Sequence, residues 1–477
     1  MLLPILLVLC AATVSAQTFP LKISSNGRYM VDQNDVPFFF MGDASPQQMF
    51  QVLSLAQMTV YYKTRSAQGF NAIWSYILCG DTEVPCTTNL ATSDGLRPFT
   101  SGSFPNYDLR TPNAAYWARM DDYIKQAATY KMVVLMFVFD TNNNMAMAAK
   151  AGNSGMYAFG QWLANRYKNF PNIIWAMGND FQTWKPGLLK GTNDARVAAQ
   201  HNELIKNLMQ GILSVDSNHI MMTELHYLSS LGSDDPVLQP YNSVRTIYTY
   251  YCTYPKVYEA YNSTPTQPAI WIEGGWENTS TFNMTYSEKN LRQQEWYNFL
   301  AGGIGGFMWA NDTLTNGGCC ANYVAQLSTT GASQMQVVKN TLTAIPWHKL
   351  VPDQSHVLVT AGYGTQSTVD SGTDLTCLNT TNYVTTAKTS DGRYSVSYAP
   401  VATTLAVNMA QYATPVRVSW VDPTNGARRP LNGGTAYTNS GTRSFTTPGS
   451  NAAGATDWVL LAVPVPAGTA RSRPSSK

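Results

Sequence analysis

The chain has 477 residues, enough for two or three domains, and 44% of them are apolar, enough for a large core. Its formal net charge is +2 and charged residues make up only 13%, which argues against a nucleic acid or an acidic surface as a partner. Aromatic residues make up 12%, which suits sugar-stacking surfaces and large cores alike.

Residues 1–16 have the features of a secretory signal peptide. The apolar run from Leu2 to Ala12 is too short to span a bilayer, and Val14-Ser15-Ala16 places small residues at a cleavage site. The stretch before the run lacks Lys and Arg, which most signal peptides have. We predict cleavage after Ala16, a secreted, extracellular protein, and no membrane association of the mature chain.

The cysteine count agrees with an oxidising compartment. Without Cys10 of the signal peptide, six cysteines remain, an even number. Cys79 and Cys86 are close enough in sequence to close a small loop by a disulfide. The pairing of the others cannot be deduced from the sequence; they are Cys252, Cys319, Cys320 and Cys377.

Five Asn-X-Ser/Thr triplets are acceptor sites for N-glycans in a secreted protein and are expected in exposed loops. They begin at Asn262, Asn278, Asn283, Asn311 and Asn379. No metal or cofactor is expected, because the histidines do not cluster with metal-ligand spacing and Cys79 and Cys86 lack a second ligand pair. The sequence also lacks G-x-S-x-G, H-E-x-x-H and a phosphate loop.

Eight short apolar runs, rich in β-branched and aromatic residues, predict strands that are buried on both faces, as in a parallel sheet. They are residues 36–43, 71–78, 133–140, 172–180, 219–226, 246–252, 269–275 and 305–312. Helical periodicity lies between them, at Ala115–Tyr130, Tyr157–Tyr167, Asp194–Leu213 and Glu288–Leu300. The alternation predicts a (β/α)8 TIM barrel over residues 17–345. The alternative, an open doubly wound sheet, is disfavoured because no dinucleotide-type Gly-rich turn follows the first run.

After Trp347 the pattern changes to short strand-like runs separated by turn residues, including Asp391-Gly392 and Asn425-Gly426. This pattern predicts a smaller all-β sandwich domain over residues 346–468. Residues 469–477 lack apolar side chains worth burying and are predicted to form a flexible tail.

Polar and aromatic residues at the ends of the eight runs are candidates for chemistry, because the carboxyl ends of barrel strands face the active-site mouth. They are Asp43, Trp74, Asp140, Asn179, Asp180, His226, Glu273, Trp309 and Asp312. Asp180 on the fourth run and Glu273 on the seventh form a carboxyl pair. Such a pair can cleave a glycosidic bond, one group donating a proton to the leaving oxygen and the other attacking the anomeric carbon.

Each of these residues also has a structural interpretation. Asp43 and Asp140 can cap the helices that follow them, and His226 can be a satisfied structural histidine. Trp74, Trp276 and Trp309 can be core residues rather than sugar platforms.

Several segments resemble the apiosidase-like glycoside hydrolases, glycoside hydrolase family 140. LKISSNGRYMVDQNDVPFFFMGDAS resembles the family's N-terminal β-hairpin and first strand, and YYKTRSAQGFNAIW its second strand with the preceding helix. NIIWAMGND and IWIEGGWEN resemble the fourth- and seventh-strand motifs, and RQQEWYNFLAGGIGGFMWAND the last helix and eighth strand. WHKLVPDQ, SVSYAP, VSWVDPTNG and DWVLLAV resemble the collagen-binding-like β domain that follows this barrel in many members.

The resemblance implies a retaining glycosidase with Asp180 as acid/base and Glu273 as nucleophile. We predict substrate contacts from Asp43, Trp74, Asn179, His226, Trp276 and Trp309. Members act on apiosyl linkages of rhamnogalacturonan II, a plant pectin, so a polysaccharide or oligosaccharide is the expected substrate. The same mechanism acting on another β-glycan, such as a β-glucan or mannan, and a non-catalytic carbohydrate-binding protein are the alternatives.

Three pocket residues depart from the family pattern. Asn179 replaces the usual second Gly before the acid, Phe307 stands near a place where His is common, and Ala-Ser-Pro follows Asp43 where Thr-Ala-Trp is common. We expect these changes to influence which sugar is accepted.

Overall fold

The computed structural model describes residues 17–78, 89–188, 194–279, 285–315, 322–369 and 375–465. The predicted signal peptide and tail lie outside these ranges. So do Asn283 and four of the cysteines, which are Cys79, Cys86, Cys319 and Cys320.

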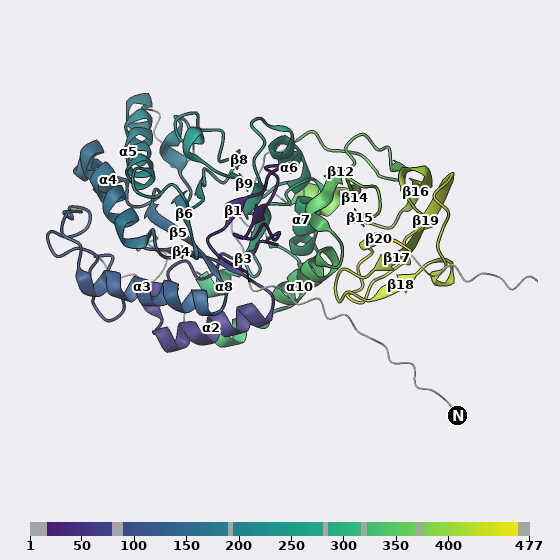
Figure 1. The fold of residues 1–477 in the computed structure, drawn as a ribbon, viewed down its shortest axis with the longest axis horizontal. Coiled ribbons are helices and arrows are strands. Elements are labelled where there is room, and N and C mark those ends of the chain that lie inside the picture. The colour runs from purple at the N-terminus through teal and green to yellow at the C-terminus, as the bar shows by residue number, and fades with distance from the viewer. Residues whose placement is uncertain are drawn as a thin grey trace, which may run out of the picture.

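Eight parallel strands form the first part of the structure (Figure 1). They are β3 (Met41–Asp43), β4 (Ala72–Tyr76), β5 (Val133–Asp140), β6 (Ile173–Gly178), β7 (Met221–Thr223), β9 (Arg245–Tyr248), β10 (Ala269–Glu273) and β11 (Gly306–Trp309). The strand order is β7-β6-β5-β4-β3-β11-β10-β9, and β8 (Ser230–Leu231) pairs antiparallel with β9. Each strand lies within one of the eight predicted runs or begins one residue before it.

The sheet curls until its two ends meet. The Ser243 amide donates to the Met221 carbonyl at 2.8 Å, and the Thr246 hydroxyl donates to the Thr223 carbonyl at 2.5 Å. These bonds join β9 and the segment before it to β7, the strand at the other end of the order. The predicted TIM-like barrel is therefore confirmed.

Helices follow most of the strands and cover the outside of the barrel (Figure 1). They are α1 (Met49–Val52), α2 (Leu55–Ala67), α3 (Ala114–Thr129), α4 (Met145–Tyr167), α5 (Ala195–Leu213), α6 (Thr253–Asn262), α7 (Glu288–Leu300), α8 (Asp312–Thr315), α9 (Tyr323–Gln326) and α10 (Thr330–Thr343). Short 3-10 turns occur at η1 (Gln182–Trp184), η2 (Gln239–Tyr241) and η4 (Trp347–Lys349). Ser54 and Ser287 begin α2 and α7 with capping boxes, which satisfy amide groups that the first helical turn leaves free.

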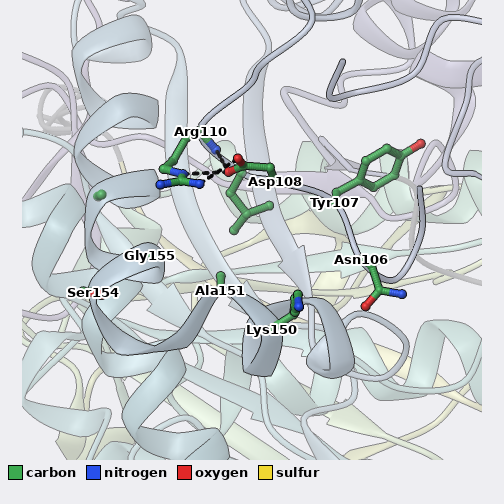
Figure 2. Close-up of a pocket in the computed structure, with 10 residues that line it drawn as sticks. Asn106, Tyr107, Asp108, Arg110, Lys150, Ala151, Ser154 and Gly155 are labelled. Atoms are coloured by element: carbon green, nitrogen blue, oxygen red, sulfur yellow. Dashed lines mark hydrogen bonds and ion pairs between the residues drawn. The ribbon is translucent and has the colours of Figure 1, made fainter. Parts of the chain in front are cut away.

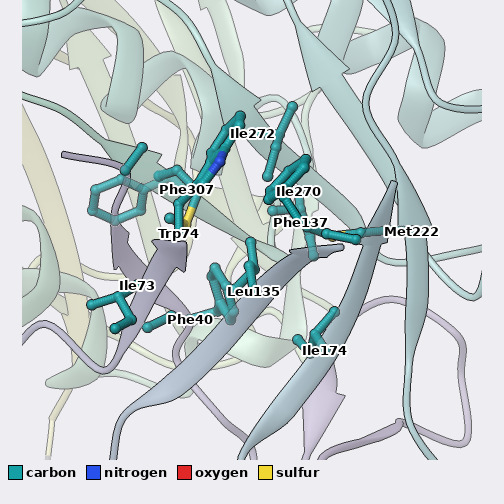
Figure 3. Close-up of a cluster of buried hydrophobic side chains, with 14 of the residues drawn as sticks. Phe40, Ile73, Trp74, Leu135, Phe137, Ile174, Met222, Ile270, Ile272 and Phe307 are labelled. Atoms are coloured by element: carbon teal, nitrogen blue, oxygen red, sulfur yellow. The ribbon is translucent and has the colours of Figure 1, made fainter. Parts of the chain in front are cut away.

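Large apolar side chains fill the barrel (Figure 3). Trp74 stacks on Phe137 of the neighbouring strand, with ring centroids 4.1 Å apart and planes 10° from parallel. Before the barrel, β1 (Lys22–Ile23) and β2 (Met30–Val31) form the antiparallel hairpin that the resemblance implied.

The C-terminal part consists of two antiparallel sheets, which confirms the predicted β-sandwich. Six strands have the order β12 (Leu350–Pro352), β14 (Thr385–Thr389), β15 (Ser395–Ala399), β20 (Trp458–Pro464), β17 (Val416–Val421) and β18 (Arg428–Pro430). Three have the order β13 (Val359–Ala361), β16 (Thr404–Asn408) and β19 (Thr442–Thr446). Short helical turns are α11 (Thr376–Thr380), η5 (Met409–Gln411) and η6 (Asn432–Gly434). Leu405, Trp420 and Phe445 belong to the apolar cluster that the two sheets enclose.

The two parts share a buried interface, with α7 between them (Figure 1). Arg292 of α7 donates two hydrogen bonds of 2.7 Å to Asp457, which directly precedes β20, and both side chains are buried. The Tyr297 hydroxyl donates to the Tyr383 carbonyl at 2.9 Å. A disulfide joins Cys252 at the start of α6 to Cys377 of α11. The sandwich therefore packs against the barrel through buried polar contacts and a disulfide.

The predicted glycan acceptors differ in exposure. Asn262, Asn278 and Asn379 are exposed. Asn311 is buried, and its side chain accepts hydrogen bonds from the Thr313 amide and from Asn278, so the expectation of an exposed loop was wrong there. In the described part of the chain, no helix combines the length and apolar character needed to cross a membrane.

Candidate active site

The chain turns sharply where β6 ends. Gly178, Asn179 and Asp180 have φ values of +106°, +66° and +51°, three left-handed residues in succession. A Cβ on Gly178 would lie 2.0 Å from the carbonyl oxygen of Glu224, so only glycine fits. Asn tolerates the left-handed region better than most residues, which suits Asn179 to this turn. The turn brings Asp180 to the mouth of the barrel.

Asn179 is held by groups on two neighbouring strands. The Tyr76 hydroxyl donates to its Oδ1, and its Nδ2 donates to Asp140 Oδ1 at 3.2 Å. Asp140 also accepts from the Asn142 amide at 2.8 Å and the Asn143 side chain at 2.9 Å. Asp140 therefore holds the Asn179 side chain and the loop that follows β5 in place.

Glu273 ends β10 and is 7% exposed. The hydroxyls of Tyr248 and Tyr250 donate to its Oε1 at 2.8 and 2.7 Å. Burial, followed by the nearby charge of Asp180, raises the pKa of Glu273 to about 8, while the tyrosine hydrogen bonds lower it. The structure thus brings together the two carboxyl groups that the sequence pairs.

Glu224 is a third carboxyl group at the same place, and the sequence analysis missed it. It follows β7 directly, is 1% exposed, and its amide donates to the Met177 carbonyl at 2.8 Å. Burial, followed by the charges of Glu273 and Asp180, raises its pKa well above the ordinary value. The run HIMMTELH contains this acid two residues before His226, the strand-end residue that was predicted.

The tyrosines around the acids were also missed. Tyr248 and Tyr250 lie two residues apart at the end of the sixth strand, and their hydroxyl oxygens are 3.0 Å from each other. Their spacing in TIYTYYC could have predicted this, because residues two apart in a strand lie on the same face.

Asp43 and Trp309 belong to a different, buried cluster. Arg65 Nε donates to Asp43 Oδ2 at 2.6 Å, and the Tyr61 hydroxyl donates to the same oxygen at 2.5 Å. The Arg65 guanidinium lies 4.9 Å from the centre of the Trp309 ring. Asp43 is 0% exposed, so its contacts favour the structural interpretation over a substrate contact.

The remaining predicted residues differ in their access to solvent. Trp74 is fully buried in the barrel core, away from solvent (Figure 3). His226 is buried and its Nδ1 accepts from the Trp184 indole at 3.1 Å; burial, with Lys185 and Lys256 adding to it, lowers its pKa to about 4, so it stays neutral. Trp276 is partly exposed, whereas Trp74 and Trp309 are buried, so Trp276 is the best placed of the three predicted tryptophans to stack on a sugar.

A hollow of about 490 Å³ lies elsewhere, between the loop before α3 and the first half of α4 (Figure 2). Arg110 donates to both carboxylate oxygens of Asp108 at 2.9 Å on its wall. None of the predicted site residues lines this hollow.

We expect Gly178→Ala to destabilise the fold by about 2–5 kcal/mol, because it adds both backbone strain and a collision with Glu224. Gly95→Ala is the matched control, since Gly95 also has a positive φ, +86°, but no atom lies within 4 Å of its added Cβ. That control should cost about 1 kcal/mol. Urea unfolding measures both variants; equal costs would show that contact with Glu224 does not constrain Gly178.

Comparison with known families agrees with this arrangement. The family model described as "Apiosidase-like, catalytic domain" matches residues 24–349, more than half of the chain. The chain belongs to the apiosidase-like family. A second model, described as "Putative collagen-binding domain of a collagenase", matches residues 365–463 of this apiosidase-like protein.

Three solved structures with the same fold are described as glycoside hydrolases. The apiosidase-like chain matches a glycoside hydrolase family 5 protein from Bacteroides vulgatus with a TM-score of 0.74 at 19% identity over 93% of each chain. It matches a second glycoside hydrolase with a TM-score of 0.73 at 19% identity, over 93% of this chain and 96% of that one. A family 30 xylanase from Clostridium acetobutylicum matches with a TM-score of 0.50 at 13% identity, over 94% and 98%. The comparison with curated proteins gives no match.

Proposed function

We propose that this apiosidase-like protein is a retaining glycoside hydrolase that acts on a plant cell-wall polysaccharide. The observation that carries the proposal is the placement of Asp180 directly after β6 and of Glu273 at the end of β10, at the same end of the barrel, where the Tyr248 and Tyr250 hydroxyls hold Glu273. Two carboxyl groups that share a buried site and differ in environment are what a double-displacement mechanism requires.

In the proposed reaction, the Asp180 carboxyl group protonates the leaving oxygen while Glu273 attacks the anomeric carbon and forms a glycosyl ester. Asp180, now a carboxylate, then takes a proton from the water that hydrolyses this ester. Tyr248 and Tyr250 both donate to Oε1 of Glu273, which leaves Oε2 as the attacking oxygen. Tyr76 and Asp140 hold the Asn179 amide beside the acid, where it can bind a sugar hydroxyl.

The substrate that we propose is the apiosyl linkage of rhamnogalacturonan II. Family membership supports it, and the partly exposed Trp276 supplies a stacking surface for a sugar. Asn179 places a side chain beside the acid where the family resemblance implies Gly, which is a specific reason to test other β-glycans as well.

We also propose that the protein is secreted. The apolar segment at residues 2–12, the disulfide between Cys252 and Cys377 and the exposed acceptors Asn262, Asn278 and Asn379 support an oxidising, extracellular setting.

The experiment is a product screen by mass spectrometry. The secreted protein and its Glu273→Gln variant are incubated with rhamnogalacturonan II, other pectins, β-glucans and mannans. We expect side-chain release from rhamnogalacturonan II by the wild type only. Release from another polymer only would support the proposed mechanism and contradict the proposed substrate. Binding without any release would contradict the proposal that the protein is an enzyme.

A further inference from the structure

The short segment between β9 and α6 carries one of the two tyrosines that hold Glu273. β9 ends at Tyr248 and α6 begins at Thr253, so the connection consists of residues 249–252. Tyr250 lies in it, and its hydroxyl donates to Glu273 Oε1 at 2.7 Å. Contacts that fix residues 249–252 therefore also fix a hydrogen bond to the carboxyl group at the centre of the site.

The barrel holds the beginning of this segment. The Thr249 amide donates to the Glu273 carbonyl of the neighbouring strand at 3.2 Å, and the Tyr251 amide donates to the Thr249 hydroxyl at 3.1 Å. The Tyr286 hydroxyl lies 3.5 Å from the Tyr250 carbonyl, at the long limit of a hydrogen bond. These contacts join the start of the segment to β10.

The sandwich holds the end of the segment. Cys252 is 0% exposed and forms a disulfide with Cys377 of α11. It occupies the N-cap of α6, where Ser, Thr, Asp and Asn are preferred because their side chains accept a hydrogen bond from a helix amide. The Cys252 side chain makes no such bond. It therefore links the segment to the sandwich instead of capping the helix.

The first two turns of α6 make further contacts with the sandwich. The Ser367 amide donates to the Tyr254 hydroxyl at 2.7 Å, and the rings of Tyr254 and Tyr383 have centroids 4.6 Å apart. The hydroxyl oxygens of Tyr258 and Tyr383 are 3.4 Å apart. The sandwich thus holds the start of α6, directly after the segment that carries Tyr250.

We propose that the C-terminal sandwich is a positioning element of the active site, which acts through the disulfide between Cys252 and Cys377 to keep the Tyr250 hydroxyl on Glu273. The catalytic consequence rests on the proposed function, in which Glu273 is the nucleophile. The disulfide joins residues 125 positions apart in the sequence, so it ties the site covalently to a part of the chain that lies outside the barrel.

A crystal structure of the double variant Cys252→Ala, Cys377→Ala tests this positioning without any substrate. The variant removes the link and leaves no unpaired thiol at either position. We expect the distance from the Tyr250 hydroxyl to Glu273 Oε1 to exceed about 3.5 Å, beyond a hydrogen bond. It is 2.7 Å with the disulfide in place.

The kinetic test is a double-mutant cycle on the substrate found in the product screen. The cysteine double variant and Tyr250→Phe should each lower kcat by roughly 10–100-fold and leave KM within about threefold, because a displacement of about 1 Å near the reacting atoms is this costly. The combined variant should be no slower than Tyr250→Phe, because the disulfide acts through that hydroxyl.

Asp457→Ala is the matched control. Asp457 also joins the sandwich to the barrel, but it does so through Arg292 of α7 and not through α6. We expect this variant, at a temperature where it is folded, to keep the Tyr250 hydrogen bond and to leave kcat within about threefold of wild type. If the cysteine double variant does not fold, Tyr254→Phe gives the same readouts, because it keeps the ring and removes the acceptor of the Ser367 amide.

Three results would overturn the proposal. The first is an unchanged distance between Tyr250 and Glu273 in the folded cysteine variant. The second is a combined variant whose loss in kcat is the product of the separate losses, because the disulfide would then act independently of Tyr250. The third is an equal displacement of Tyr250 in Asp457→Ala, which would assign the effect to general destabilisation. Failure of the product screen would leave the distance measurement unaffected, so the two proposals are tested separately.

Discussion

Replacing Glu273 with glutamine is expected to lower kcat by roughly 10⁴–10⁶-fold, because an amide cannot form the glycosyl ester. Asp180→Asn is expected to lower it by roughly 10²–10⁴-fold, the range of general acid–base catalysis. An aryl glycoside of the sugar released in the product screen distinguishes the two variants. A good leaving group needs no proton, so Asp180→Asn should still form the glycosyl-enzyme ester, whereas Glu273→Gln should not. Stopped-flow measurement of aryl release and mass spectrometry of the trapped ester give the readout.

Glu277→Gln is the matched control for these variants. Glu277 is a buried acid four residues beyond Glu273, but its carboxylate accepts from the Thr329 hydroxyl at 2.6 Å and the Gly331 amide at 2.9 Å, at the start of α10. We expect it to cost about 1 kcal/mol of stability and to leave kcat within a few-fold of wild type. Near-normal turnover by a folded Glu273→Gln protein would contradict the nucleophile assignment.

Breaking the buried ion pair between Arg292 and Asp457 should destabilise the whole chain by about 3–5 kcal/mol. Asp457→Ala leaves the guanidinium buried without its partner, and the desolvation of that charge is then uncompensated. Tyr398, which donates to Asp457 at 3.0 Å, and Asn451, which donates at 2.8 Å, would also lose an acceptor. Urea unfolding followed by circular dichroism measures the change.

The exposed pair of Lys349 and Asp391 provides the control. Its side chains are 46% and 34% exposed, so Lys349→Ala should change stability by no more than about 0.5 kcal/mol. The double variant Arg292→Met, Asp457→Leu should cost less than either single change, because it removes both charges together. Two separate unfolding transitions in the wild type would show that barrel and sandwich are not coupled through this interface.

The barrel and the sandwich could be predicted from the sequence because the signals for them are local. Continuous apolar runs such as VVLMFVFD indicate strands buried on both faces whatever lies beside them, and all eight runs contain the expected strand. The carboxyl pair followed from the same logic, since residues at the ends of parallel strands meet at one end of a barrel. Asp180 and Glu273 could thus be named without coordinates.

Only the tertiary structure decided which polar residues face the site. Asp43 ends a strand just as Glu273 does, but Arg65 and Tyr61 reach it from α2 and bury it in a structural cluster. Glu224 lies two residues before His226, and its pKa is raised by burial, followed by the charges of Glu273 and Asp180 on other strands. A carboxyl group's charge state depends on the dielectric and the charges around it, which are contributed by residues distant in sequence. The sequence therefore determined where acids can gather, and the packing of the strands determined which of them are buried in the same site.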